Sequence, residues 1–119
     1  VTDNLTELAR AALDFYRQSI PMLGALLADP RRMAAHRAAM DERGAGPDRA
    51  AAGFAAYLTA EQQLGRIDAG AAPDDVASLL VGACFHEAFL AHYRGAVDAP
   101  ARTRDTAEGL VRALVRPLL

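Results

Sequence analysis

Alanine dominates the periodic stretches of this chain, whereas β-branched and aromatic residues never alternate for long, so strand signals are nearly absent. Glycine and proline occur at a few places, and these places divide the 119 residues into about five helical segments. A chain of this length has room for one compact domain, residues 1–119. We therefore expect a single all-α domain, a bundle of about five to six helices.

Hydrophobic spacing and start and stop residues predict where the helices lie. They run from about Leu5 to Ala28, Pro30 to Glu42, Pro47 to Leu64, Pro73 to Gly95, and from Thr103–Asp105 to the C-terminus. Asp3 or Asn4 is expected to cap the first helix, and Pro21 is expected to kink or divide it. Gly65 is expected to end the third helix in a left-handed conformation. The short connector from Arg66 to Ala72 contains one residue that is expected to be buried, Ile67.

Composition indicates a soluble globular protein, with 52% apolar and 24% charged residues and a net charge of −2. This charge gives no sign of a surface that grips nucleic acid. A single cysteine, Cys84, excludes an internal disulfide and gives no reason to infer an oxidising compartment. No apolar run approaches the roughly 18 residues needed to cross a bilayer, and Val1 to Glu7 is not a secretion signal. We expect a cytoplasmic protein without a membrane partner.

The segment 76–94 is apolar nearly all round, since only Glu87 and Arg94 form a polar strip on it. Such a helix must be covered nearly all round, and a second subunit would cover it more easily than one small domain. Together with the apolar stripe of the last helix it would form a two-fold symmetric four-helix bundle. A central core helix in a monomer is the alternative. The predicted dimer interface comprises Val81, Cys84, Ala88, Ala91, Leu110, Val111, Leu114, Val115 and Leu118.

Several stretches and their order along the chain resemble the C-terminal half of TetR-family transcriptional regulators. They are Gly65–Asp68, Pro73–Ala83, Phe89–Leu90, Tyr93–Gly95 and the closing segment Leu110–Leu119. The resemblance implies a homodimer formed through the last two long helices, with a small hydrophobic effector bound inside each subunit. In that family, the effector changes the spacing of two N-terminal helix-turn-helix heads and releases DNA.

The sequence lacks a basic recognition helix and the roughly 50 residues that such a head requires. We therefore expect an effector-binding and dimerisation domain of a TetR-like regulator, in the commoner mode a repressor. Operator DNA would be bound only through the missing N-terminal domain. A dimeric binding protein that is complete without a DNA-binding head stays open as another possibility.

Large apolar and aromatic side chains on four segments are candidates to line an effector pocket, because such pockets are mostly apolar with a few polar groups. The plain alternative is that they form core. The predicted ligand-binding residues are Phe15, Tyr16, Met33, Met40, Phe54, Tyr57, Phe85, His86, Phe89 and Tyr93.

Metal binding and catalysis find little support in the sequence. His86-Glu87 begins like the zinc motif H-E-x-x-H, but Leu90 stands where the second histidine is needed, and His92 lies about 240° further round the helix. Cys84 suits a small core position. No nucleophile–base pair or phosphate-binding glycine loop is legible, so we expect no enzyme, no metal and no cofactor. The alternative is a small monomeric helical enzyme or haem-binding protein that uses His86 or His92.

Overall fold

The computed structural model describes residues 1–95 and 100–119, except for the side chains of residues 100 and 101. The described chain is all-helical, as expected. Its elements are α1 (Thr2–Ala28), α2 (Pro30–Glu42), α3 (Arg49–Gln63), α4 (Pro73–Tyr93), α5 (Pro100–Val115) and the 3-10 turn η1 (Arg116–Leu118).

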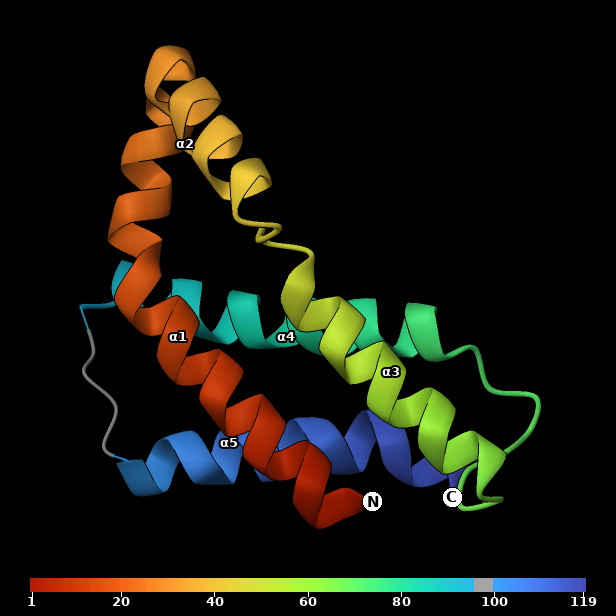
Figure 1. Cartoon of the computed structure of the whole chain (residues 1–119). Helices are drawn as coiled ribbons and strands as arrows, with labels where there is room; N and C mark the ends of the chain where they lie inside the picture. The colour runs from red at the N-terminus through yellow and green to blue at the C-terminus, as the bar shows by residue number, and fades with distance from the viewer. Residues whose placement is uncertain (96–99) are drawn as a thin grey trace.

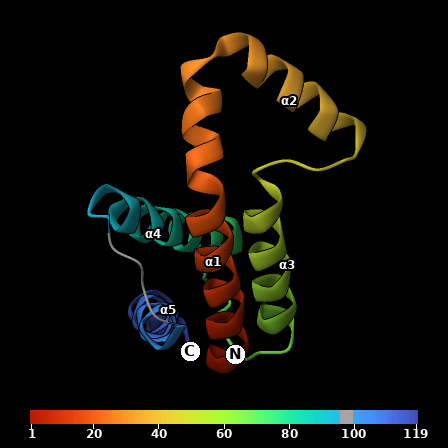
Figure 2. The same cartoon turned by 90° about the vertical axis from the view of Figure 1, so that its left-hand side faces the viewer.

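The helices form two layers. α4 and α5 lie in one layer, and α1 and α3 cross over it as the second (Figure 1, Figure 2). α2 projects from the end of α1, away from both layers. The molecule is accordingly flat, with extents of 46 × 34 × 17 Å. We call the side of α4 and α5 that faces away from α1 and α3 the outer face.

The core lies where α1 crosses α4 and α5. α1 contributes Leu5, Ala9, Leu13 and Tyr16, which recur every three or four residues and so share one side of the helix. Small side chains on α4 let the two helices approach closely, so that the Cys84 Sγ atom lies 3.8 Å from the carbonyl oxygen of Ala9. The remaining buried apolar residues of α4 and α5 are Val76, Ala77, Leu80, Ala88, Ala91, Ala107, Val111 and Val115.

α1 continues through Pro21, so the expected division of this helix does not occur. A proline lacks the N–H that would bond the carbonyl four residues earlier, here that of Arg17. The His92 Nε2 atom, on α4, donates a hydrogen bond to this carbonyl oxygen instead. A side chain from another helix therefore supplies the donor that the proline removes.

Local signals fix most helix ends. Asp29 caps α2 by accepting hydrogen bonds from two backbone N–H groups of its first turn. Gly65 follows α3 with a φ of +75°, which confirms the expected left-handed C-cap. The expected cap of α1 at Asp3 or Asn4 is wrong, because α1 already begins at Thr2. Asn4 Nδ2 instead donates to the Tyr57 hydroxyl on α3, at 3.1 Å.

The connector between α3 and α4 is tied down by polar contacts. Gln62 Nε2 lies 3.0–3.1 Å from three carbonyl oxygens of the segment 68–71. The backbone N–H of Asp68 donates to the carbonyl of Leu118 at 2.7 Å, which joins the connector to the last turn of the chain. Ile67 is buried, as its sequence context suggests. These contacts fix the start of α4 relative to the end of α5.

The expectation that no apolar run approaches the length needed to cross a bilayer is wrong for α4, which spans 21 residues. By length and composition alone it could cross a bilayer, because the stretch 76–93 contains a single charged residue, Glu87. In the structure, its buried side packs on α1, α3 and α5, as the central helix of a bundle does.

Candidate functional site

The outer face of α4 carries an exposed strip of residues with helical spacing. Leu79, Gly82, His86, Phe89 and Tyr93 follow one another at intervals of three and four, so they lie along one side of the helix. The exposed fractions of the three large apolar members are 61%, 49% and 80% for Leu79, Phe89 and Tyr93. We call these five residues the outer strip.

α5 extends this apolar surface. Leu110 and Leu114 are half-buried, and Gly109 and Ala113 are exposed beside them without bulky side chains. Small residues on a helix surface let a second helix approach closely. Arg112 lies further round the exposed side of α5.

Five of the nine predicted dimer-interface residues are buried within one subunit. Cys84, Ala88, Ala91, Val111 and Val115 are all at most 9% exposed within one subunit. Four of them belong to the core of the same chain, and Cys84 contacts the Ala9 carbonyl on α1. They therefore offer no surface to a second subunit.

The other four predicted interface residues keep part of their surface. They are half-buried and pack against the core: Val81, Leu110, Leu114 and Leu118. Sequence reasoning missed Leu79 and Gly82 of the outer strip. Their three-and-four spacing with His86 was legible, but an all-apolar helix gives no signal for which side faces its own core.

Aromatic side chains connect α1 to α4. The Tyr16 ring meets Phe15 and Phe85 edge to face, with ring centroids 5.6 and 5.4 Å apart. Tyr16 is buried, and burial raises the pKa of its hydroxyl, to which the neighbouring Cys84 adds. Phe89 and Tyr93 stack on each other at 6.3 Å, further along α4.

The predicted ligand-binding residues do not gather around one enclosed cavity. Tyr16 and Phe54 belong to the core, so they are not free to line a pocket in this structure. Met33 and Met40 lie half-buried on α2. Tyr57, on α3, is also half-buried, and its hydroxyl accepts a hydrogen bond from Asn4 on α1. Exposed members are found on α1 and α4: Phe15, Phe85, His86, Phe89 and Tyr93.

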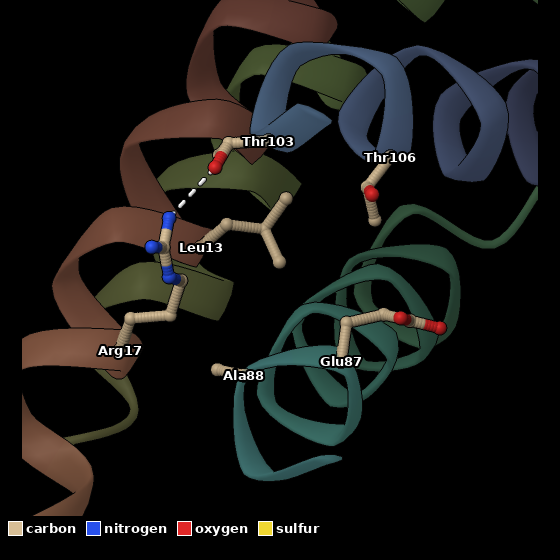
Figure 3. Close-up of a pocket in the computed structure, with 6 residues that line it drawn as sticks. All are labelled: Leu13, Arg17, Glu87, Ala88, Thr103 and Thr106. Carbon is tan, nitrogen blue, oxygen red and sulfur yellow. Dashed lines mark hydrogen bonds between the residues drawn. The ribbon is translucent and has the colours of Figure 1, made fainter. Parts of the chain in front are cut away.

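A small polar pocket lies between α1, α4 and α5, and none of the predicted ligand-binding residues lines it. Figure 3 shows its walls, with Arg17 Nη1 donating to the Thr103 hydroxyl at 2.7 Å and Glu87 opposite. Its cavity volume of about 10 Å³ is enough for one water molecule. It also contains Leu13, Ala88 and Thr106.

The three histidines have different environments. His92 bonds the Arg17 carbonyl, His86 belongs to the outer strip, and His36 is half-buried on α2. Within residues 1–95 and 102–119, no three histidine, cysteine or acidic side chains lie close enough together to hold a metal ion.

The thiol of Cys84 is not poised for reaction. Burial raises its pKa to about 12, and the Glu87 carboxylate adds to the shift. A thiol with this pKa stays protonated at neutral pH and is a poor nucleophile. The position is that of a small core side chain.

Comparison of the chain with protein-family models, with curated proteins and with solved structures found no match.

Proposed function

We propose that this chain is the effector-binding and dimerisation domain of a TetR-like transcriptional repressor. The observation that carries the proposal is the exposed apolar strip on α4, and the adjoining helix α5 also keeps half-buried leucines. In water, a contiguous surface of this kind marks an interaction site. The resemblance implies pairing through the last two long helices, which in this structure are α4 and α5.

The total exposed surface of the chain supports a second copy of the chain as the partner that covers the outer face. The chain exposes 7615 Å², whereas a monomeric protein of its mass exposes about 6,200 Å². The difference of about 1,400 Å² exceeds the roughly 800 Å² that each partner buries in a standard interface. The projecting α2 accounts for part of this additional exposed area. The outer face of α4 and α5 is the apolar part of the remaining area.

The effector in this proposal is a small apolar molecule that contacts α1 and α2. Phe15, 62% exposed, and Met22 lie two turns apart on one side of α1. α2 turns Met33, His36 and Met40 to one side, half-buried, without burying any residue fully. An apolar molecule held between these side chains would add the core contact that α2 lacks.

The mechanism is a shift between two arrangements of the dimer. An effector that binds one arrangement more tightly raises its population. Operator DNA would be bound by a helix-turn-helix domain rather than by these 119 residues, and its affinity would depend on the arrangement of the dimer.

Sedimentation velocity over a dilution series tests the dimer. We expect the wild type to be a dimer at micromolar concentration and Leu79→Glu to be a monomer, because the charge enters the outer strip. Leu27→Glu is the matched control, since Leu27 is 74% exposed at the far end of α1. A wild type that is monomeric at every concentration, with its helical spectrum intact, would overturn the proposal.

Thermal unfolding with a panel of small apolar molecules tests the effector site. A molecule that binds the folded chain raises Tm with concentration. Phe15→Ser is expected to abolish this shift, and Leu27→Ser to retain it. A shift that survives Phe15→Ser would place the effector elsewhere.

A further inference from the structure

The outer strip has the spacing of a helix-pairing seam. Its members are separated by three, four, three and four residues, and the exposed Asp75 continues the series four residues before Leu79. Alternating intervals of three and four keep a seam facing one partner helix. Large side chains stand toward the ends of the strip, and Gly82 and His86 stand in the middle.

The charges on α4 favour an antiparallel partner. Asp74 and Asp75 lie in the first turn, and Arg94 lies at the other end. If two copies of α4 run antiparallel, the acidic end of each lies beside the basic end of the other, and the helix dipoles also oppose favourably. A parallel arrangement would place like charges together. The charge pattern therefore fits a second copy of the same helix.

Two-fold symmetry then decides which residues meet. In an interface that pairs the same surface with itself, residues at its centre lie near their own copies, and residues at its ends lie near the opposite ends. The midpoint of the strip from Leu79 to Tyr93 is His86, with Gly82 one turn away. The missing side chain of Gly82 leaves room, since nothing lies within 4 Å of a Cβ placed there.

We propose that His86 of two copies meets at the two-fold axis of an antiparallel α4 pairing, so that mild acid dissociates the dimer. This inference rests on the proposed function, which supplies the dimer. An imidazole gains its proton near pH 6.5. Two neutral imidazoles can lie together in an apolar seam, whereas two charged ones repel each other and lose hydration.

The charged groups on the neighbouring helices do not offset this charge. α1 pairs Asp14 with Arg10 and Arg17, at 3.0 and 3.5 Å. α3 pairs Glu61 with Arg66 at 3.2 Å. The exposed side of α5 carries a mainly basic set, Arg102, Arg104, Asp105 and Arg112, and Arg104 pairs with the half-buried Glu108 at 3.7 Å. Arg116 follows in η1.

On α4 itself, Glu87 points to the small pocket between α4 and α5, and Asp75 lies almost three turns from His86. A proton on His86 therefore adds positive charge to the outer strip, and the exposed side of α5 is already mainly basic. Dissociation at low pH follows from both repulsions.

Sedimentation equilibrium at pH 8.0, 7.0, 6.0 and 5.5, at fixed ionic strength, tests the inference. We expect the dimer dissociation constant of the wild type to rise at least tenfold across this range, and that of His86→Gln to stay flat. Gln63→His, which adds an exposed imidazole on α3 outside the outer strip, is the control and should follow the wild type. Circular dichroism at each pH checks that the subunit stays folded.

The outcomes separate this inference from the proposed function. A wild-type dimer that is equally tight at every pH, or a pH dependence that persists in His86→Gln, would overturn the inference and leave the dimer standing. A wild type that is monomeric at pH 8.0 would overturn both.

Discussion

At the scale of single residues, two polar contacts let the crowded centre of the molecule form. Pro21 leaves the Arg17 carbonyl without its helical donor, and His92 replaces that donor across the interface between α1 and α4. Arg17 itself is anchored by Thr103 on α5. One turn of α1 is therefore bonded to both helices of the other layer, which fixes the crossing.

A double-mutant cycle tests the link between Pro21 and His92. His92→Ala is expected to lower the free energy of unfolding by about 1 kcal/mol, because a carbonyl loses its partner. In a Pro21→Ala background this cost should vanish, since alanine restores the backbone donor. Urea unfolding measures both, and His92→Gln, which keeps a donor, is the control. An equal cost in the two backgrounds would show that the residues are not coupled.

The buried thiol predicts a loss of stability in alkali. The pKa of Cys84 is about 12 in the folded chain and near the ordinary value of 9.0 in the unfolded chain. Its contribution is therefore fully present below pH 9 and is lost as the pH rises from 9 toward 12, because only the unfolded chain releases the proton.

We expect the wild type to lose up to about 1.4 kcal/mol per pH unit more than Cys84→Ala above pH 9. Urea unfolding between pH 8 and 10.5 gives the two slopes. Identical slopes would mean that the thiol does not titrate differently in the two states.

At the scale of elements, α2 differs from the other four helices. None of its residues is buried, and its main neighbour is the end of α1. Its local signals are good: Asp29 caps it, Pro30 occupies its first turn, and four alanines and two methionines favour helix within Met33–Met40. Short helices gain most of their stability from tertiary packing, however. α2 should thus be the least stable element.

Limited trypsin digestion tests this ranking. Cleavage after Arg31, Arg32, Arg37 and Arg43 is expected well before cleavage after Arg10 or Arg17, because proteases cut regions that open locally. Mass spectrometry of a time course identifies the sites. Equally fast cleavage within the first half of α1 would show that the molecule opens as a whole rather than at α2.

At the scale of the whole molecule, the flat two-layer shape leaves a large surface uncovered. The radius of gyration is 15.5 Å, against about 13.5 Å for a compact domain of this length. With two layers of helices, α4 and α5 are covered by α1 and α3 on one side only. A second copy seated on the outer face would give α4 the all-round cover that its sequence calls for.

The dimer makes thermal stability depend on concentration. If folding and pairing are linked, we expect Tm of the wild type to rise by roughly 3–5 °C per tenfold increase in protein concentration. Leu79→Glu should unfold at the same temperature at all concentrations. Calorimetry over two decades of concentration distinguishes them, and a constant wild-type Tm would speak against linked pairing.

The sequence alone determined the helices and most of their ends. Periodicity, Pro30, Pro73 and the left-handed Gly65 are local signals, so they do not depend on what the helix packs against. The end of α1 near Ala28 and the burial of Ile67 were likewise legible. Features that depend only on a few neighbouring residues could be predicted before the packing of the helices was known.

Only the tertiary structure decided which side of each helix is covered. α4 is apolar nearly all round, so its pattern could not show that Cys84 and Ala88 face α1 while Leu79 and Phe89 face outward. The continuity of α1 through Pro21 was equally unpredictable, because its compensating donor, His92, is 71 residues away in the chain. Local chemistry fixes elements, whereas the choice between equivalent faces depends on long-range contacts that form only when the helices meet.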